Sequence, residues 1–445
     1  MIFGLLFTVY IYLLSFLFFT TVLLIAFDLS WGRIPHYYVE ILHKIQLMFQ
    51  KAYPEDYFEK LPWKNIITDK KSILECNDHH DDYEIIDKQI GFPYNTKLNL
   101  IRSGVEAIVQ DEFSQAFELS PDHKKYRLSL ELWNYSDLKL KILFVLMILI
   151  RFFVIFPVRL ALFVSSFVFI TVCCILTYWI EFTTQQKLVI SRRFCRLYTA
   201  GTGLIAFFHN EELKPKPPGV FVSNHMSAND VMILSLDISP NQDFLYTVTG
   251  QQHAGIIGYI QRLVSKLIST MWLERSIADS RLKFLKEVLA AAKNSHLVLM
   301  FPEGFCSNNT AVLQFRKAVF EKEIEIYPVA IKQDSRFGDA FWYEDWFVFH
   351  LFRVISSYAT IYNVHYLPAQ RRWEDETAEQ FALRIQNQIA KVADCRSLSF
   401  QGTLFYKQHD REKYQSHMRK MVAAEVNRIS AEAPAGYNMS NSDSP

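Results

Sequence analysis

The chain has almost no charge imbalance, with 47 basic and 46 acidic residues among 445 and a formal net charge of +1. Nucleic-acid binders concentrate basic residues, so this balance argues against a dedicated nucleic-acid partner. Cysteine is also scarce. The six cysteines form no C-x-x-C pair and have no regular spacing, which argues against a disulfide framework and a zinc site and fits a reducing compartment. The cluster Asp78-His79-His80-Asp81-Asp82 has no spaced partner ligand, so we interpret it as a solvated loop and expect no metal.

Apolar residues, in contrast, are abundant, and half of the chain is hydrophobic. Phe3 to Phe27 carries no charge and exceeds the roughly 20 residues that span a bilayer. A cleaved signal peptide would need a basic start and a small-residue cleavage site, and neither is present. We therefore predict that residues 1–28 are a transmembrane anchor. Basic residues follow the segment rather than precede it, which places the N-terminus in the lumen and the rest of the chain in the cytosol.

A second apolar block runs from Ile142 to Ile180 and is interrupted by Arg151, Pro157 and Arg159. Two complete spans do not fit into it comfortably. We predict that residues 141–182 form a membrane-embedded or re-entrant helical hairpin whose arginines reach up to the lipid headgroups. A buried hairpin of a soluble protein is the alternative. Basic residues on both flanks are expected on anionic headgroups: Lys139, Lys141, Lys187, Arg192 and Arg193.

The remaining chain divides into three parts. Residues 29–140 are polar and mixed, and we interpret them as a cytosolic N-terminal region. Residues 190–400 are the predicted folded domain, and residues 430–445 are too poor in apolar side chains to order themselves. Between about 200 and 370, short apolar runs alternate with helix-like segments such as Ser280–Lys293. This alternation predicts an α/β fold, with a mixed sheet flanked by helices. The runs read as strands are Gly219–Val222, Phe244–Val248, His296–Phe301, Glu325–Ile331 and Ala359–Tyr366.

One pair of residues stands out in this domain. His225 and Asp230 form an H-x-x-x-x-D pair directly after the apolar run Val220–Val222, which we interpret as a short buried strand. A histidine held by a carboxylate accepts a proton near neutral pH, as transfer to a hydroxyl requires. Five residues turn through about 500° on a helix, so the two cannot share a helical face. The pair needs a turn at the strand's end, with Asp230 near the start of a helix at Val231–Leu236.

Three further stretches follow in order. Met271-Trp272-Leu273-Glu274-Arg275 is an apolar strand end that delivers an arginine, for which a surface ion pair with Glu274 is the ordinary alternative. Phe301-Pro302-Glu303-Gly304 is a strand running into a turn, where glycine lets the backbone approach a ligand; a plain turn is equally compatible. In the third, Ile326 to Lys332, Pro328 interrupts a strand, so an edge or a bulge is expected.

Taken in order, these four stretches resemble the four blocks of the glycerophospholipid and lysophospholipid acyltransferase family, over roughly residues 200–370. Within that family the chain is most similar to the animal endoplasmic-reticulum glycerol-3-phosphate acyltransferases. That similarity rests on the stretches Trp272–Ser276, Phe301–Gly304, Asn308–Thr310, Pro328–Lys332 and Phe337–Trp342.

The resemblance implies an acyl-CoA-dependent O-acyltransferase of the endoplasmic-reticulum membrane, with its catalytic domain in the cytosol. The expected reaction acylates the first hydroxyl of glycerol 3-phosphate and gives lysophosphatidate for phospholipid and triacylglycerol synthesis. Acyl-CoA would be a co-substrate, and no cofactor is implied. One alternative is acylation of lysophosphatidate or another lysophospholipid. A second alternative is an inactive membrane scaffold with the same fold.

The resemblance also assigns roles to residues. His225 would be the general base and Asp230 the carboxylate that orients it, while Arg275 would bind the acceptor's phosphate. The implied substrate-binding residues are Asn224, Arg275, Glu303, Gly304 and Pro328. An acyl-CoA thioester is already activated, so Cys306 is not needed as a nucleophile.

Two residues depart from the family pattern. Phe305 stands where Thr or Ser usually follows Pro-Glu-Gly, so a hydroxyl contact to the acceptor is missing and the acceptor's identity stays open. Ser269 replaces a glycine often found six residues before the arginine.

Overall fold

The computed structural model describes residues 2–51, 116–120, 137–237 and, with short gaps, 244–420. Several predictions lie outside these residues: most of the region 29–140 with its loop at 78–82, Arg275, and the tail 430–445. Contacts divide the chain into two compact units. The first comprises Met1–Lys60 and Ala116–Gly402, and it contains all the elements below except part of the last short helix. The second falls mostly outside the described residues.

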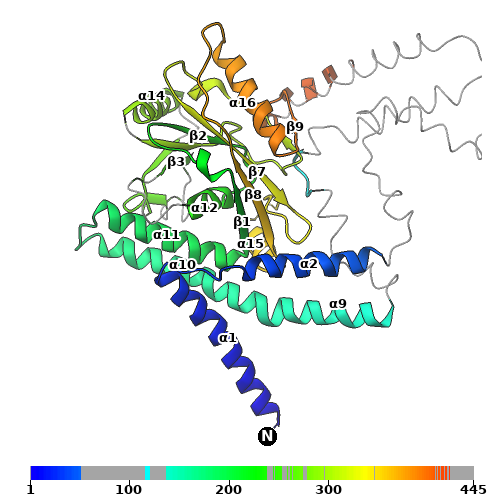
Figure 1. The fold of residues 1–445 in the computed structure, drawn as a ribbon. Helices are drawn as coiled ribbons and strands as arrows, with labels where there is room; N and C mark the ends of the chain where they lie inside the picture. Colours follow the sequence, from blue (N-terminus) through cyan, green and yellow to red (C-terminus); the bar gives the residue numbers. More distant parts are fainter. Residues whose placement is uncertain are drawn as a thin grey trace, which may run out of the picture. The chain divides into compact units, whose positions relative to one another are not determined.

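The described residues form a mixed seven-stranded sheet in the order β1-β8-β7-β2-β5-β3-β4 (Figure 1). All neighbouring strands run parallel except β7 and β8, which pair antiparallel. The predicted α/β fold with a mixed sheet is therefore confirmed. The strands are β1 (Leu204–His209), β2 (Gly219–Ser223), β3 (Tyr246–Gln251), β4 (Thr270–Leu273), β5 (Leu297–Met300), β7 (Ile326–Asp334) and β8 (Thr360–Tyr366). A separate two-stranded pair joins β6 (Ala311–Val312) and β9 (Arg396–Ser397).

Helices cover both faces of the sheet, because successive side chains of a strand point to opposite sides. In β2, Phe221 packs into one core with helices α11, α12 and part of α10 (Phe156–Leu176), whereas Val220 and Val222 pack into the other with α14 and α16. These helices are α11 (Thr184–Thr202), α12 (Asn229–Leu236), α14 (Ala278–Asn294), α15 (Phe347–Ile355) and α16 (Ala378–Val392). Three short 3-10 turns complete the domain: η4 (Glu211–Leu213), η5 (Lys317–Val319) and η6 (Gly402–Phe405).

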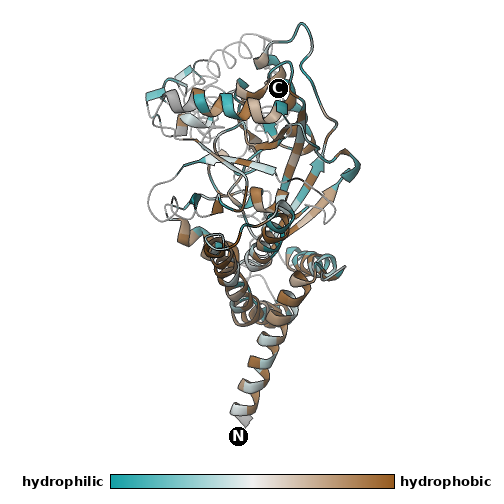
Figure 2. Ribbon diagram, turned by 90° about the vertical axis from the view of Figure 1, so that its left-hand side faces the viewer, coloured by the Kyte–Doolittle hydropathy of each residue, from teal (hydrophilic) through white to brown (hydrophobic). Residues whose placement is uncertain are grey.

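The N-terminal helix α1 (Ile2–Ala26) matches the predicted anchor. It is one of two described helices that are long and apolar enough to cross a membrane, and few of its residues are buried against the rest of the chain. Its apolar side chains give the helix marked N its brown and pale colours in Figure 2. Its C-terminal part packs against α10 and α11 through Phe18, Val22 and Ile25, and nearer its start Tyr10 donates a hydrogen bond to the Phe153 carbonyl at 2.8 Å. The helix α2 (Ile34–Gln50) follows and packs beside β1 and β8.

The predicted hairpin within 141–182 is wrong. Helix α9 (Leu138–Ile150), the π-helical turn η3 (Arg151–Ile155) and helix α10 (Phe156–Leu176) form one apolar helix of 39 residues. Pro157 does not break it, because the proline directly follows a π-helical turn, where the regular i→i−4 hydrogen-bond ladder is already interrupted. The wider π turn, closed by a bond from the Phe156 amide to the Arg151 carbonyl, keeps the backbone helical across the junction. The chain reverses only after Leu176, and α11 then returns along α10 (Figure 1).

The arginines of this helix do not reach toward headgroups as predicted. Arg159 is buried and donates to the carbonyls of Ser357 and Tyr358, the latter at 2.7 Å, while Arg151 donates to the Ser356 carbonyl. These carbonyls follow the last residue of α15 and lack donors within that helix, so the guanidinium groups satisfy them. Gly203 makes room for Arg159: a Cβ there would lie 2.2 Å from the guanidinium carbon.

Two of the basic flanking residues likewise form hydrogen bonds within the protein. Arg192 holds both carboxylate oxygens of Asp28 at 3.0 and 2.8 Å, and Arg193 donates to the Ala26 carbonyl. The expectation that Arg192 lies on headgroups is therefore wrong, and for the partly exposed Arg193 it stays a prediction. They fasten the end of α1 to α11, and the Arg192 contact holds the pKa of Asp28 below its usual value.

Candidate active site

The predicted site lies at the carboxyl edge of the sheet. Strand β2 ends at Ser223, and its parallel neighbour β5 ends at Met300, immediately before the turn that carries Glu303. The strands β3 and β4 continue the same parallel order outward. Because the carboxyl ends of parallel strands meet at one edge, the loops after β2 and β5 are brought together there, which is where open α/β sheets bind ligands.

His225 and Asp230 are in contact, as their spacing predicted. Asp230 lies in the first turn of α12, and its Oδ2 is 2.8 Å from Nδ1 of His225. The same oxygen accepts the backbone amides of Met226 at 2.6 Å and Ser227 at 3.0 Å. An oxygen that already accepts two N–H groups is an acceptor toward the ring as well. Nδ1 therefore carries the proton, and Nε2 is left as the basic nitrogen.

The surroundings of His225 hold the ring in place. The ring stacks on Phe301 with centroids 4.1 Å apart, and its side chain is 19% exposed while Asp230 is fully buried. The backbone carbonyl of His225 accepts the Ser307 amide at 2.9 Å. Burial disfavours a charged ring, but the side chains of Cys306 and Asp230 together outweigh it, so the pKa of His225 lies well above its usual value.

Glu303 lies beneath the site. It is fully buried, and its two oxygens accept the backbone amides of His225 at 2.7 Å and Leu313 at 2.8 Å. Burial raises the pKa of this carboxyl to about 8, although both amide donors act in the opposite direction. That Glu303 lines the acceptor site stays a prediction, and the contacts that the structure shows are with backbone amides. Its contacts fix the backbone of the histidine.

Asn224 and Pro328 also have structural contacts, and their predicted roles at the acceptor site stay predictions. Asn224 is buried, and its amide group both donates to and accepts from the backbone of Ile331, at 2.9 and 2.8 Å. Pro328 is buried beside Val222 in β7, which lies inside the sheet and not at an edge. The proline is tolerated because the ladder with β8 begins only at Val329, so its missing N–H falls where that strand has ended.

Gly304 completes the turn after β5 in the conformation that its residue type favours. Its φ is +67°, and a Cβ would lie 2.9 Å from the guanidinium carbon of Arg316. Its amide closes the turn on the Phe301 carbonyl at 3.0 Å. The ring of the following Phe305 packs where a Cβ on Gly402 would be, with the Arg316 guanidinium 5.8 Å from its centre. Phe305 thus occupies a packed position beside the turn.

Comparisons with known proteins agree with this geometry. A family model described as Acyltransferase matches residues 206–332. Glycerol-3-phosphate acyltransferase 3 of Rattus norvegicus is 34% identical over 401 residues, which cover 85% of this chain and 83% of the rat protein. The chain belongs to the glycerol-3-phosphate acyltransferase family. Human glycerol-3-phosphate acyltransferase 3 is also 34% identical, over 72% of this chain and 75% of its own.

Among solved structures, the 1-acyl-sn-glycerophosphate acyltransferase of Thermotoga maritima aligns with 14% identity and a TM-score of 0.39, covering 57% of this chain and 96% of its own. The family resemblance stated from the motifs is thereby confirmed by the sequence relatives. Membership of this acyltransferase family makes the chain an acyltransferase whose substrates are an acyl donor and a glycerol-phosphate or lysophospholipid acceptor.

Two of the family-based assignments depend on the outer strands. Arg275, the predicted phosphate ligand, lies outside the described residues, and β4 ends two residues before it. Ser269, which departs from the family pattern, lies just before β4 and its hydroxyl is 2.9 Å from that of Thr247 in β3. That hydrogen bond gives the serine a local structural role between neighbouring strands.

Several residues that shape the candidate site were not predicted from sequence. Ser307 and Leu313 act through backbone amides, which leave no mark on residue type. Asn309 is different: it has a φ of +61°, which asparagine tolerates, and its side chain bonds Ile331 and Gln333 of β7 at 3.0 and 2.8 Å. The Asn308-Asn309 pair after the turn was the available signal. Among the residues that the structure describes, no three His, Cys, Asp or Glu side chains gather as metal ligands.

Proposed function

We propose that this protein is an acyl-CoA-dependent glycerol-3-phosphate 1-O-acyltransferase that makes lysophosphatidate. The observation that carries the proposal is the contact between Nδ1 of His225 and Asp230 at the carboxyl end of β2, in a chain whose relatives bear this enzyme's name. The runner-up is acylation of lysophosphatidate or another lysophospholipid by the same residues, and an inactive scaffold is the remaining alternative.

The proposed reaction is a direct transfer. Nε2 of His225 takes the proton of the acceptor hydroxyl as its oxygen attacks the thioester carbonyl of acyl-CoA. The tetrahedral intermediate then collapses, the carbon–sulfur bond breaks, and the CoA thiolate leaves with the proton that the imidazolium returns. Asp230 keeps the correct tautomer and stabilises the imidazolium. Acyl-CoA serves as a co-substrate, so the step requires no cofactor.

The remaining residues have supporting roles in this proposal. Arg275 would hold the acceptor's phosphate, since a guanidinium matches phosphate geometry. Glu303 keeps the His225 amide in place, and Gly304 lets the loop after β5 turn sharply. Asn224 and Pro328 fix β7 against β2. These four residues shape the site from below, and substrate contact is assigned to Arg275.

We further propose that the enzyme resides in the endoplasmic-reticulum membrane with the sheet domain in the cytosol. Two helices capable of crossing a membrane support a membrane location. The product is a lipid whereas CoA and glycerol phosphate are soluble, so a site at the cytosolic surface serves both. A protease-protection test on intact microsomes checks the orientation: residues 200–370 should be cleaved from outside.

The decisive assay supplies membranes containing the protein with labelled acyl-CoA and either glycerol 3-phosphate or lysophosphatidate. We expect acylation of glycerol 3-phosphate, and loss of that activity in His225→Ala. Acylation of lysophosphatidate alone would establish the runner-up. Acylation of neither acceptor, nor of other lysophospholipids supplied in the same assay, would contradict the enzymatic proposal and favour the scaffold.

A further inference from the structure

Helix α15 has an unusual distribution of side chains for a helix at a protein surface. Trp346, Val348, Phe349 and Phe352 are exposed, whereas His350 is buried. A surface helix of a soluble protein normally does the opposite, with its apolar stripe on the core and its polar face in water. Trp342 and Tyr343, just before the helix, are exposed as well.

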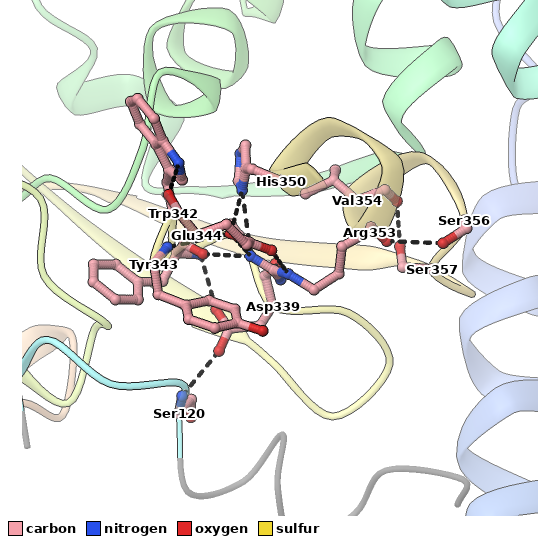
Figure 3. A network of polar contacts seen from close by, with 12 residues as sticks. Ser120, Asp339, Trp342, Tyr343, Glu344, His350, Arg353, Val354, Ser356 and Ser357 are labelled. Atoms are coloured by element: carbon pink, nitrogen blue, oxygen red, sulfur yellow. Dashed lines mark hydrogen bonds and ion pairs between the residues drawn. The ribbon is translucent and has the colours of Figure 1, made fainter. Parts of the chain in front are cut away.

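The polar side chains of α15 are committed inward, as Figure 3 shows. Arg353 binds the Glu344 carboxylate and donates to the carbonyls of Asp339 and Phe341, the latter at 2.6 Å. His350 lies 3.7 Å from the same Glu344. The carboxylate is partly buried, which opposes its charge, yet these two partners hold the pKa of Glu344 at about 2. The ion pair therefore persists across the physiological pH range.

A second set of contacts fixes the end of the helix. Arg151 and Arg159 of the long apolar helix bind the carbonyls that follow Ile355, as described above. With its inner face and its end both held by buried hydrogen bonds, α15 cannot rotate to bury Phe349 without breaking them. The exposed apolar face is thus a fixed feature of the fold.

This face is continuous with the apolar surface of the long helix α9–η3–α10. The Phe352 ring meets the Phe156 ring edge to face, with centroids 5.3 Å apart. Nearby in sequence to Phe156, Phe152, Phe153 and Leu160 are themselves exposed. That helix is one of the two described helices apolar enough for a membrane. The surface of α15 therefore adjoins one already suited to lipid.

We propose that the outer face of α15, together with Trp342, Tyr343 and Trp346, inserts into the lipid surface that also receives α9–η3–α10. At 9 residues the helix is too short to cross a bilayer, so it lies in the plane of the interface. Tryptophan and tyrosine are enriched at that depth, because their rings are apolar and their polar groups bond to water or headgroups. The sheet domain is then seated on the membrane by its own helix as well as by the N-terminal anchor.

The test uses full-length protein in phosphatidylcholine vesicles that contain brominated lipid, which quenches tryptophan on contact. The variant is Trp346→Phe, and the matched control is Trp373→Phe; the two indoles are 71% and 63% exposed, and the control lies just before α16 on the other side of the sheet. Removing one of 8 tryptophans changes about one eighth of the emission. We expect Trp346→Phe to remove emission that brominated lipid quenches, and Trp373→Phe to remove emission that aqueous acrylamide quenches.

Lipids brominated at different positions along the acyl chain measure the depth of Trp346 in the bilayer. Bromines near the top of the acyl chain should quench the emission lost in Trp346→Phe more strongly than bromines near its end. If that emission is quenched by acrylamide and not by lipid, α15 faces water and the proposal is overturned. If neither reagent quenches it, a protein covers the face, and the proposal is overturned in favour of that partner.

Discussion

The loop after β2 and helix α10 each bury a charged side chain, the first with hydrogen-bond partners close in sequence and the second with partners far along the chain. In the loop, the Asp230 carboxylate is fully buried and binds the His225 ring and two amides from within five residues of sequence. In the helix, the Arg159 guanidinium is buried and binds carbonyls nearly 200 positions away. Both groups are stable inside the protein because the fold supplies hydrogen-bond partners. Short-range partners show in a motif, whereas long-range partners do not.

The largest loss of activity is expected when the imidazole ring of His225 is removed. His225→Ala should lower kcat by about 10²–10⁴-fold, because a general base contributes that much to proton transfer. His209→Ala is the matched control, since that histidine lies on the edge strand β1 and stacks on His365. Acyl transfer from acyl-CoA is the measurement. Equal turnover in the two variants would contradict the assignment of His225 as the base.

The second prediction concerns stability and tests the long-range hydrogen bonds of Arg159. Arg159→Leu leaves the Ser357 carbonyl buried without a donor and the Tyr358 carbonyl with the Tyr38 hydroxyl alone, at about 1–3 kcal/mol for each lost partner. We expect the free energy of unfolding to fall by about 3 kcal/mol, measured as a lower melting temperature of the full-length protein in detergent. Lys139→Leu, at an exposed position of the same helix, should have little effect. Equal melting temperatures of the two variants would contradict the buried hydrogen bonds and indicate that Arg159 reaches toward headgroups.

The contrast between the two regions explains which expectations were met. The strands, the start of α12 and the His225–Asp230 contact follow from local patterns of period, spacing and turn chemistry. The long helix does not follow from such patterns, because Arg151 and Pro157 look like interruptions in the sequence. In the fold, Arg151 binds a carbonyl that follows α15, and Pro157 follows the π-helical turn. Glu303 was placed in the correct loop, but its burial depends on amides from the loop after β2 and from the residue after β6. Residue type alone cannot show on which side of a turn a carboxylate points.

A third prediction, of a smaller fall in kcat, tests whether Glu303 supports the backbone of His225 or contacts the acceptor. Glu303→Gln keeps one accepting oxygen but presents an NH₂ group to the second amide, so one buried hydrogen bond is lost at about 1–3 kcal/mol. Because the His225 amide then loses its support, we expect kcat to fall while the KM for glycerol 3-phosphate changes little. Initial rates against acceptor concentration give both constants. A rise in KM at constant kcat would instead show that Glu303 contacts the acceptor, as the family resemblance implied.

The smallest effect is a shift of the pH profile, and its sign follows from the pKa of His225. The base acts only when deprotonated, so a pKa held well above its usual value places the acid limb of kcat/KM above the usual histidine range. Cys306→Ala removes one interaction that raises this pKa, and Asp230 remains. The pKa should therefore fall, the acid limb should move to lower pH, and the variant should retain a larger share of its own maximum at mildly acidic pH. Ser265→Ala, on an exposed turn before β4, is the control of similar size. An acid limb that stays in place, or moves to higher pH, would show that Cys306 does not favour the charged ring and would leave Asp230 as its main support.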